Sequence, residues 1–220
     1  KSMYFENYYC ETATGGTSDA EFLANTSLYP LKTGAVFMKY PGNYYYSLPK
    51  ILKEQGYSTL AMHAYKPGFW NRSVMYPNLG FDEFINKTDF VHDEVIGMGV
   101  SDKSFFRQSL DHLKTIKEPY YAFMVTLTSH YPYDNTESYH NALDTGELKN
   151  TFIGNYLEAI HYADESLGYL IDRLEEEGMM DNTVIAVYGD HYAISKDRKE
   201  ELAEFLNISD MNDYMWVKHQ

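Results

Sequence analysis

Two adjacent residues in the C-terminal part of the chain could bind a metal ion. Asp190 and His191 follow an apolar run and a glycine in the sequence IAVYGDHYAIS, residues 185–195. A carboxylate oxygen beside an imidazole nitrogen is a donor pair that suits a divalent metal such as zinc or manganese. The pair also fits a simpler arrangement, in which Asp190 caps the following segment and His191 faces solvent. The sequence alone leaves both possibilities open.

A candidate nucleophile lies near the N-terminus, in the stretch GGTSDAEF, residues 15–22. Its glycines allow close approach to the backbone, and Thr17 and Ser18 supply hydroxyl groups. The four residues from Ser18 to Glu21 have the capping-box pattern of a helix start. Such a start favours an anion, so a hydroxyl there could attack a phosphate if a metal lowered its pKa. An ordinary N-cap would give the same pattern.

Two further stretches contain side chains that could bind phosphate. Arg72, in FWNR, has a guanidinium fork that matches phosphate oxygens, and Trp70 beside it could stack on a polyol or an acyl-glycerol stem. His130, in TSHYPY, could hydrogen-bond a phosphate oxygen or act as a general acid. The alternative for FWNR is a tryptophan anchored in the core next to a solvated arginine.

Three short, near-continuous apolar runs predict buried strands of a parallel sheet. They are Ser58–His63, Tyr120–His130 and Thr183–His191. Each run ends in a histidine, and ligands of open α/β sheets bind at the carboxyl ends of the strands. We therefore expect His63, His130 and His191 to contribute to a polar site, although any one of them could simply be a hydrogen-bonded histidine at a strand end.

Periodic apolar positions predict helices between these strands. The expected helices are Ser47–Gln55, Lys103–Lys117 and Thr151–Glu177. Alternating strands and helices indicate an α/β fold with a mostly parallel central sheet and helices on both faces. Met62–Asp93 and Tyr131–Lys149 are turn-rich and are expected to be loops. Without a clear linker, residues 1–220 are predicted to form one domain, and the final MWVKHQ has the pattern of a strand cut short.

Charge and cysteine content exclude some classes of partner. The net charge of −14 argues against a nucleic-acid partner, because no basic patch offsets the phosphate charge. Cys10 is the single cysteine, so no intrachain disulfide can form, which suits either a reduced cytosol or the outer face of a Gram-positive membrane. No apolar run reaches the roughly 18 residues of a transmembrane helix, so this sequence is not expected to span a membrane.

Taken in order, these stretches resemble the extracellular catalytic domain of the lipoteichoic acid synthases, which are phosphoglycerol transferases of the alkaline phosphatase and sulfatase superfamily. The resemblance runs from about Tyr4 to Trp216 and depends on the order and spacing of the motifs. These motifs are GGTSDAEF, NTSLY, YSLP, His63 with FWNR following it, LTSHYP and YGDHY.

The resemblance implies a role for each candidate residue. Thr17 matches the nucleophile that becomes a phospho-threonine, and it is also a metal ligand together with Asp190 and His191. His130 and Arg72 match residues that hold the glycerophosphate, with Trp70 beside them and His63 on the same rim. The implied metal is Mn(II), with Mg or Zn as alternatives.

The resemblance also implies a donor, an acceptor and a location. The donor would be phosphatidylglycerol, and the acceptor would be the end of a glycerophosphate polymer. The enzyme would work on the extracellular face of the cell membrane of a Gram-positive bacterium, held there by N-terminal helices that this sequence does not include. The domain is accordingly expected to be incomplete at both ends.

The sequence departs from the family pattern in two places. The family has a further metal ligand, a Glu upstream of the nucleophile and after a strand, whereas only Glu6 and Glu11 precede Thr17 and neither follows a strand-like run. The family also has an acidic residue shortly after the first rim histidine, where this chain reads AYKPG, residues 64–68. The glycerol contacts, and with them the acceptor, could therefore differ.

Four other functions remain in view. A sulfatase needs a formylglycine motif, which the sequence after Cys10 does not match. A phosphoethanolamine transferase is disfavoured by the single cysteine. A phosphoglycerol transferase that acts on periplasmic glucans shares many of the motifs. A non-catalytic glycerophosphate-binding module is the alternative from a different class.

Overall fold

A computed structural model describes residues 2–139 and 143–219 of the chain. Its centre is a parallel sheet in the order β2-β1-β5, formed by Glu83–Asn86, Ser58–His63 and Tyr120–Met124. In the register of this sheet, Leu60 of β1 pairs with Glu83 on one side and with Ala122 on the other. A small antiparallel pair, β3 (Val95–Ile96) and β4 (Gly99–Val100), lies before the next helix. The central strand β1 is therefore hydrogen-bonded along both of its edges.

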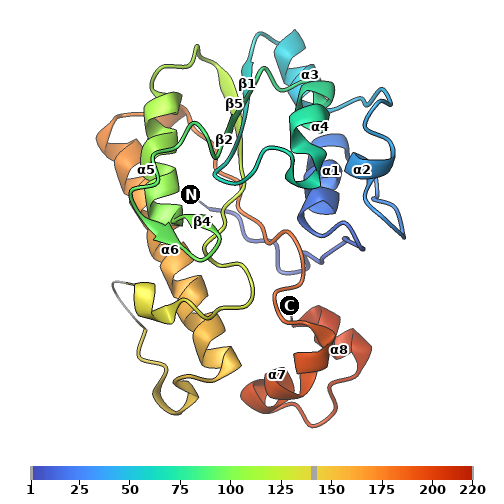
Figure 1. Cartoon of the computed structure of the whole chain (residues 1–220), viewed down its shortest axis with the longest axis vertical. Helices are drawn as coiled ribbons and strands as arrows, with labels where there is room; N and C mark the ends of the chain where they lie inside the picture. Colours follow the sequence, from blue (N-terminus) through green and yellow to red (C-terminus); the bar gives the residue numbers. More distant parts are fainter. Residues whose placement is uncertain (1, 140–142, 220) are drawn as a thin grey trace.

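Helices cover both faces of this sheet (Figure 1). On one side lie α1 (Thr17–Thr26), α2 (Val36–Lys39), α3 (Leu48–Glu54) and α4 (Arg72–Leu79). On the other lie α5 (Asp102–Leu113) and α6 (Phe152–Glu176). The helices α7 (Lys199–Leu206) and α8 (Asp213–Lys218) follow at the C-terminal end. Short 3-10 turns are Phe69–Asn71 (η1), Thr136–Ser138 (η2), Gly146–Leu148 (η3), Met180–Asn182 (η4) and Lys196–Arg198 (η5).

The alternation of side chains along β1 explains the two layers of helices. Leu60 and Met62 belong to the cluster under α5 and α6, whereas Ala61 between them belongs to the cluster under α1, α2 and α4. Successive residues of a strand point to opposite faces, so a strand that is buried along almost its whole length has to be covered on both sides. This arrangement confirms the predicted α/β fold with a parallel sheet.

The predicted helices are found with small differences at their ends. α3 and α6 lie inside their predicted ranges, and Thr151 is the N-cap of α6, its hydroxyl accepting from the Gly154 amide at 3.0 Å. α5 ends at Leu113 rather than at Lys117, because the chain turns at residues 114–116 before entering β5. Long amphipathic helices were thus the most reliable part of the sequence interpretation.

Two strand predictions are wrong. β5 ends at Met124 rather than at His130, because its partner β1 ends at His63 and the last bond between them runs from the Val125 amide to the Met62 carbonyl, at 3.0 Å. Residues 183–191 do not form a strand: Val184 is 95% exposed, and none of these residues pairs with a strand in the described part of the chain. An apolar run without a neighbouring strand cannot satisfy its backbone groups in a ladder.

Three further segments differ from the sequence interpretation or lie partly outside the description. The predicted loop Met62–Asp93 contains η1, α4 and β2 and is therefore largely ordered secondary structure. Of the C-terminal MWVKHQ, residues 215–218 belong to α8 and not to a strand, because Asn212 caps a helix there by accepting from the Met215 amide at 3.1 Å, and Gln220 is outside the described part. Tyr131–Lys149 contains short 3-10 turns, and residues 140–142 of this predicted loop are outside the described part.

Candidate active site

Thr17 is the first residue of α1, where a helix presents free amide groups. The loop before it is held by the buried Asp19, whose Oδ2 accepts from the amides of Ala13 and Gly15 at 3.0 and 2.9 Å. The hydroxyl of Ser18 donates to the Gly15 carbonyl at 2.8 Å. The capping box predicted from Ser18 and Glu21 does not form, and the Thr17 side chain stays partly exposed at the start of the helix.

Gly16 brings this helix start against His191. Its φ of +49° lies in the left-handed region, which an L side chain rarely adopts. A Cβ added at Gly16 would also lie 3.7 Å from Cδ2 of His191. Thr17 and His191 are 174 residues apart in the sequence (191 − 17). The contact at Gly16 nevertheless brings the segment of the candidate nucleophile to that of one candidate metal ligand.

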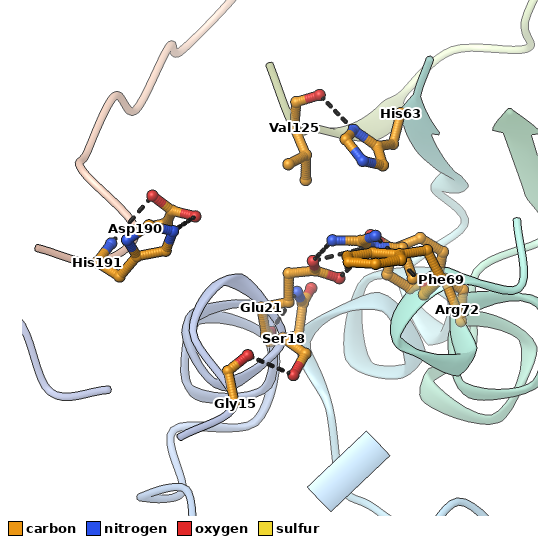
Figure 2. Close-up of polar contacts among 11 residues, drawn as sticks. Gly15, Ser18, Glu21, His63, Phe69, Arg72, Val125, Asp190 and His191 are labelled. Atoms are coloured by element: carbon orange, nitrogen blue, oxygen red, sulfur yellow. Dashed lines mark hydrogen bonds and ion pairs between the residues drawn. The ribbon is translucent and has the colours of Figure 1, made fainter. Parts of the chain in front are cut away.

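Asp190 and His191 face each other across 3.6 Å, from Asp190 Oδ2 to His191 Nε2 (Figure 2). The other carboxylate oxygen of Asp190 accepts from the His191 amide at 3.0 Å. The His191 Nδ1 lies 3.0 Å from the Tyr192 carbonyl, which can only accept. This contact needs a proton on Nδ1, which makes Nε2 the ring nitrogen that could bind a metal, as in a metal-ligating histidine.

These donors fit part of a divalent metal site. A neutral imidazole nitrogen, a carboxylate oxygen and the Thr17 hydroxyl are ligands that Zn, Mn or Mg accept. Among the described residues, however, no group of three or more His, Cys, Asp or Glu side chains is placed to hold a metal together. Glu6 and Glu11, which precede Thr17, are both exposed.

His130 lies near both His191 and His63. The rings of His130 and His191 meet edge to face with their centroids 6.1 Å apart. His63 is 3% exposed at the end of β1, and its Nδ1 lies 2.9 Å from the Val125 carbonyl. Burial, followed by the charge of Arg72, lowers the pKa of His63 to about 3, so its ring is neutral. The three histidines predicted to meet at strand ends thus converge, although only His63 lies within a strand.

Arg72 is the first residue of α4 and is almost wholly buried, at 1% exposed. Its Nε donates to Oε1 of Glu21 at 2.9 Å, and its Nη2 makes a second bond to the same carboxylate (Figure 2). The Tyr76 hydroxyl donates to Oε2 of Glu21 at 2.7 Å. Nη1 of Arg72 lies 3.4 Å from the Phe69 carbonyl, so most of the guanidinium donors of Arg72 are used within the protein.

Trp70 lies just before Arg72 in a backbone turn of unusual conformation. Both Trp70 and Asn71 have positive φ, +54° and +58°. Asn71 fixes the turn by donating to the Phe37 carbonyl at 2.8 Å, and the Trp70 ring packs against Phe69 with centroids 5.6 Å apart. Such backbone conformations cost free energy and often occur at binding sites. The partly exposed Trp70 ring is therefore held in place by the turn.

Two hollows open beside the candidate residues. One, of about 250 Å³, is lined by Thr128, His130 and Tyr131 together with residues of the loop after β3. The other, of about 480 Å³, lies next to Asp190 and is lined mainly by tyrosines and by apolar residues of α1. A substrate could approach the histidines from the first and Asp190 from the second.

Sequence reasoning missed two buried acids that support the site. Glu21 was interpreted as a capping residue but forms the ion pair with Arg72, 51 positions away, and neither local pattern indicates that pairing. Asp102 was given no role, since the predicted helix begins at Lys103, yet its carboxylate accepts from the amides of Leu127 and Thr128, just before His130. Nothing in the local pattern around Asp102 indicates that contact.

Comparison with known proteins defines the family. The model of the Sulfatase family matches residues 1–208, so the chain belongs to the sulfatase family. Within this family it is similar to lipoteichoic acid synthases. It is 34% identical to Lipoteichoic acid synthase 2 of Bacillus subtilis strain 168 over 97% of this chain and 33% of that protein. It is 37% identical to the lipoteichoic acid synthase of Staphylococcus aureus strain NCTC 8325 over 98% of this chain and 35% of that protein.

Solved structures give the same result. The crystal structure of the lipoteichoic acid synthase LtaP from Listeria monocytogenes matches with a TM-score of 0.85 and 31% identity, over 92% of this chain and 50% of that one. A Streptococcus pyogenes phosphoglycerol transferase in complex with sn-glycerol-1-phosphate shares the fold, with a TM-score of 0.59 and 22% identity over 76% of this chain and 47% of that one. The chain spans about a third of the length of the curated relatives, and none of its described helices has the length and apolar character of a membrane span.

Proposed function

We propose that this chain carries catalytic residues of a metal-dependent phosphoglycerol transferase. The enzyme would move glycerophosphate from phosphatidylglycerol, through a phospho-threonine at Thr17, to a growing polyglycerolphosphate chain of the lipoteichoic acid type. The observation that carries the proposal is the meeting of the α1 N-terminus with His191 at Gly16. Support comes from the similarity to lipoteichoic acid synthases and from the fold shared with a transferase that was solved with sn-glycerol-1-phosphate.

The proposed reaction is a double displacement at phosphorus. The Thr17 oxygen attacks phosphorus and loses its proton to solvent, the bond from phosphorus to the diacylglycerol oxygen breaks, and His130 protonates that oxygen. An acceptor hydroxyl then attacks the phospho-threonine and gives its proton to His130, while the bond from phosphorus to the Thr17 oxygen breaks and that oxygen takes a proton back from solvent. Free amides at the start of α1 would stabilise the charge that develops on the phosphoryl oxygens.

A divalent metal, Mn(II) with Mg or Zn as alternatives, would be held by Asp190, His191 and Thr17, and when bound it would lower the pKa of the Thr17 hydroxyl. The Nδ1 contact of His191 orients its ring for that role. By the family resemblance, Arg72 and His130 would hold the glycerophosphate. Trp70 would lie beside them and His63 on the same rim. Because Arg72 is bonded to Glu21, a direct phosphate contact would use its Nη1 side, whose bond to Phe69 is the longest.

The proposed location is the extracellular face of the membrane of a Gram-positive bacterium. The phosphatidylglycerol donor is a membrane lipid, so the transferase has to act at the membrane surface. The net charge of −14 opposes direct adsorption to anionic headgroups, which favours attachment through a separate membrane segment of the parent protein.

The decisive experiment replaces the proposed nucleophile. Thr17→Ala in the full-length protein is expected to abolish release of diacylglycerol from phosphatidylglycerol with Mn(II) present, because no oxygen remains to attack phosphorus. Thr14→Val is a matched control, since Thr14 is an exposed hydroxyl nearby that bonds only the Gly34 amide in the described contacts. Undiminished release by Thr17→Ala would exclude Thr17 as the nucleophile.

A second candidate function is glycerophosphate binding without catalysis. It is favoured by one observation, that the described residues do not offer three metal-ligating His, Cys, Asp or Glu side chains at one place. Calorimetry with sn-glycerol-1-phosphate, run beside the release assay on the full-length protein, separates the two functions. Binding without turnover in the presence of Mn(II) would support the binding module and contradict the transferase.

A further inference from the structure

The segment that leads to His130 is fastened to the sheet at its start. The Val125 amide donates to the Met62 carbonyl at 3.0 Å, and the Val125 carbonyl lies 2.9 Å from Nδ1 of His63. The pKa of His63 is far below neutrality, so its ring carries one proton, and the acceptor at Val125 places that proton on Nδ1. These contacts fix residue 125 but leave four more residues before His130.

Asp102, the first residue of α5, holds the middle of the segment. Its side chain is 1% exposed, and its Oδ1 accepts from the amides of Leu127 at 2.8 Å and Thr128 at 3.0 Å. In return, the Asp102 amide donates to the Thr128 hydroxyl at 2.8 Å. The His130 amide then donates to the Leu127 carbonyl at 3.2 Å and closes the turn. Three hydrogen bonds therefore join α5 to the two residues that form the base of the His130 turn.

The start of α5 does not need this carboxylate as its cap. The neighbouring Ser101 is the N-cap, with its hydroxyl accepting from the Ser104 amide at 3.2 Å. The second carboxylate oxygen of Asp102, Oδ2, is buried without a hydrogen-bond partner among the described residues, and burial raises the pKa of this acid. A buried acid is unfavourable unless its contacts compensate, and here the compensating contacts are those to the His130 segment.

We infer that Asp102 is a positioning residue, which locks residues 127 and 128 so that the His130 ring stays against His191 and the start of α1. This inference rests on the proposed function, in which His130 exchanges a proton with the oxygens that leave and attack phosphorus. The ring centroids of His130 and His191 are 6.1 Å apart, so a shift of about 1 Å in the turn would move His130 out of reach of a shared phosphoryl group.

The test combines a structural readout with kinetics on the full-length protein. Asp102→Ala is expected to shift the imidazole NMR signals of His130 in the absence of substrate. It should also lower kcat for diacylglycerol release by roughly 10- to 100-fold and raise KM by a smaller factor, because His130 exchanges the proton and, by the family resemblance, also holds the glycerophosphate. Asp102→Asn keeps an acceptor oxygen for both amides and is expected to restore the His130 signals and most of kcat.

Ser101→Ala is the matched control. It removes the cap of α5 at the adjacent residue without touching the amides of Leu127 and Thr128, so it should lower the melting temperature but leave the His130 signals unchanged. The inference is overturned if Asp102→Ala leaves the His130 signals and kcat as in the wild type. It is also overturned if Ser101→Ala produces the same shift, because the effect would then come from the stability of α5 as a whole.

Two other outcomes also decide the inference: a variant that does not fold, and a wild-type protein without transferase activity. If Asp102→Ala does not fold, Thr128→Val removes one bond of the lock at nearly constant volume, and it should shift the His130 signals in the same direction; no shift in that folded variant overturns the inference. If the wild-type protein releases no diacylglycerol while the NMR results are as expected, the proposed function fails and the positioning of His130 by Asp102 stands.

Discussion

His63 lies beside the candidate active site, but its side chain is buried and its contacts are those of a core residue. It is 3% exposed, bonded to the Val125 carbonyl, and placed near the charged Arg72 and the ring of His130. Protonation would put a second positive charge next to Arg72 in a buried place, so the folded protein excludes the proton. Because an ordinary histidine has a pKa near 6.5, this difference between the folded and unfolded states makes stability depend on pH.

The first prediction follows from that difference. The folded pKa of His63 is about 3, below the unfolded value of 6.5, so its contribution to stability is complete above pH 6.5 and is lost as pH falls toward 3. The free energy of unfolding should fall by up to about 1.4 kcal/mol for each pH unit in this window. Urea unfolding of the chain at pH 7, 6 and 5 measures the slope, in a range where carboxylates contribute little.

The matched variant for this measurement is His63→Gln, which cannot take up a proton in the unfolded state. The slope of its unfolding free energy against pH, between pH 7 and 5, should be smaller than that of the wild type. The difference corresponds to at most about one proton taken up on unfolding. Equal slopes for the two proteins would show that His63 titrates alike in both states, and the proposed burial of a neutral ring would be wrong.

At the scale of elements, the Glu21–Arg72 pair joins the helix that carries Thr17 to the helix that follows Trp70. Glu21 and Arg72 are 2% and 1% exposed, and the neighbouring Tyr76, which is fully buried, bonds the same carboxylate. Each charged group depends on its partner, because an unpaired charge in such a place is strongly unfavourable. The relative placement of α1 and α4, and with it that of Thr17 and Trp70, therefore depends on this pair.

The second prediction concerns removal of one member of the pair. Glu21→Gln is expected to lower the free energy of unfolding by about 3–5 kcal/mol, because it leaves the Arg72 charge buried without its counter-ion. Asp82→Asn is the comparison, since Asp82 and Lys53 form an ion pair that is about half exposed, and it should cost less than about 1 kcal/mol from the loss of that pair alone. Chemical denaturation of the two variants checks this difference.

The third prediction removes the pair as a whole. Glu21→Met combined with Arg72→Met and Tyr76→Phe should be closer to the wild type in stability than Glu21→Gln alone, because apolar side chains replace all three coupled polar groups. Activity should not return in the triple variant if Arg72 contacts phosphate. If the triple variant is less stable than Glu21→Gln, the ion pair makes the protein more stable than apolar side chains at the same positions would.

Elements could be predicted from the sequence where the signal is local and long. The apolar period of α6 extends over 25 residues, and its boundaries were found almost to the residue. In contrast, β2 has four residues and α4 has eight with an internal proline, so neither has a strong local pattern. Both elements depend on contacts with β1 and the Glu21 pair, which are made between distant parts of the chain.

The site could be predicted by residue type but not by pairing. Thr17, Asp190, His191, His63 and His130 were identified from their chemistry and positions, and the structure brings them near one another. The partner of Arg72 could not be predicted, because an ion pair between residues 51 positions apart leaves no trace in either local pattern. A phosphate contact at Arg72 remains a prediction for the proposed function.

At the scale of the whole molecule, the segment before Asp190 is held by few backbone contacts. Val184 and Val187 are 95% and 67% exposed, and no amide between residues 184 and 190 donates to another backbone group of the described chain. By contrast, β1 bonds to strands on both edges. The candidate metal ligands therefore follow a segment that gives them little support, whereas His63 follows the best supported strand.

The fourth prediction is a large difference in hydrogen exchange. Amides of residues 184–188 should exchange within seconds at neutral pH in this chain, whereas those of Leu60–Met62 should be protected by several orders of magnitude, since only the latter lie in ladders. Mass spectrometry of peptides from the two segments measures this. Protection of residues 184–188 comparable to that of β1 would show that the segment forms a strand in solution.

The run VIAVY, residues 184–188, which is exposed except for the partly buried Ile185, also has a consequence for handling the protein. It is apolar, rich in β-branched residues, free of charge and proline, and without strand partners in the described chain, which are the features of a segment that pairs with copies of itself. The net charge of −14 makes two molecules repel each other and opposes that pairing. Salt screens this repulsion, so aggregation of the isolated chain should accelerate as ionic strength rises.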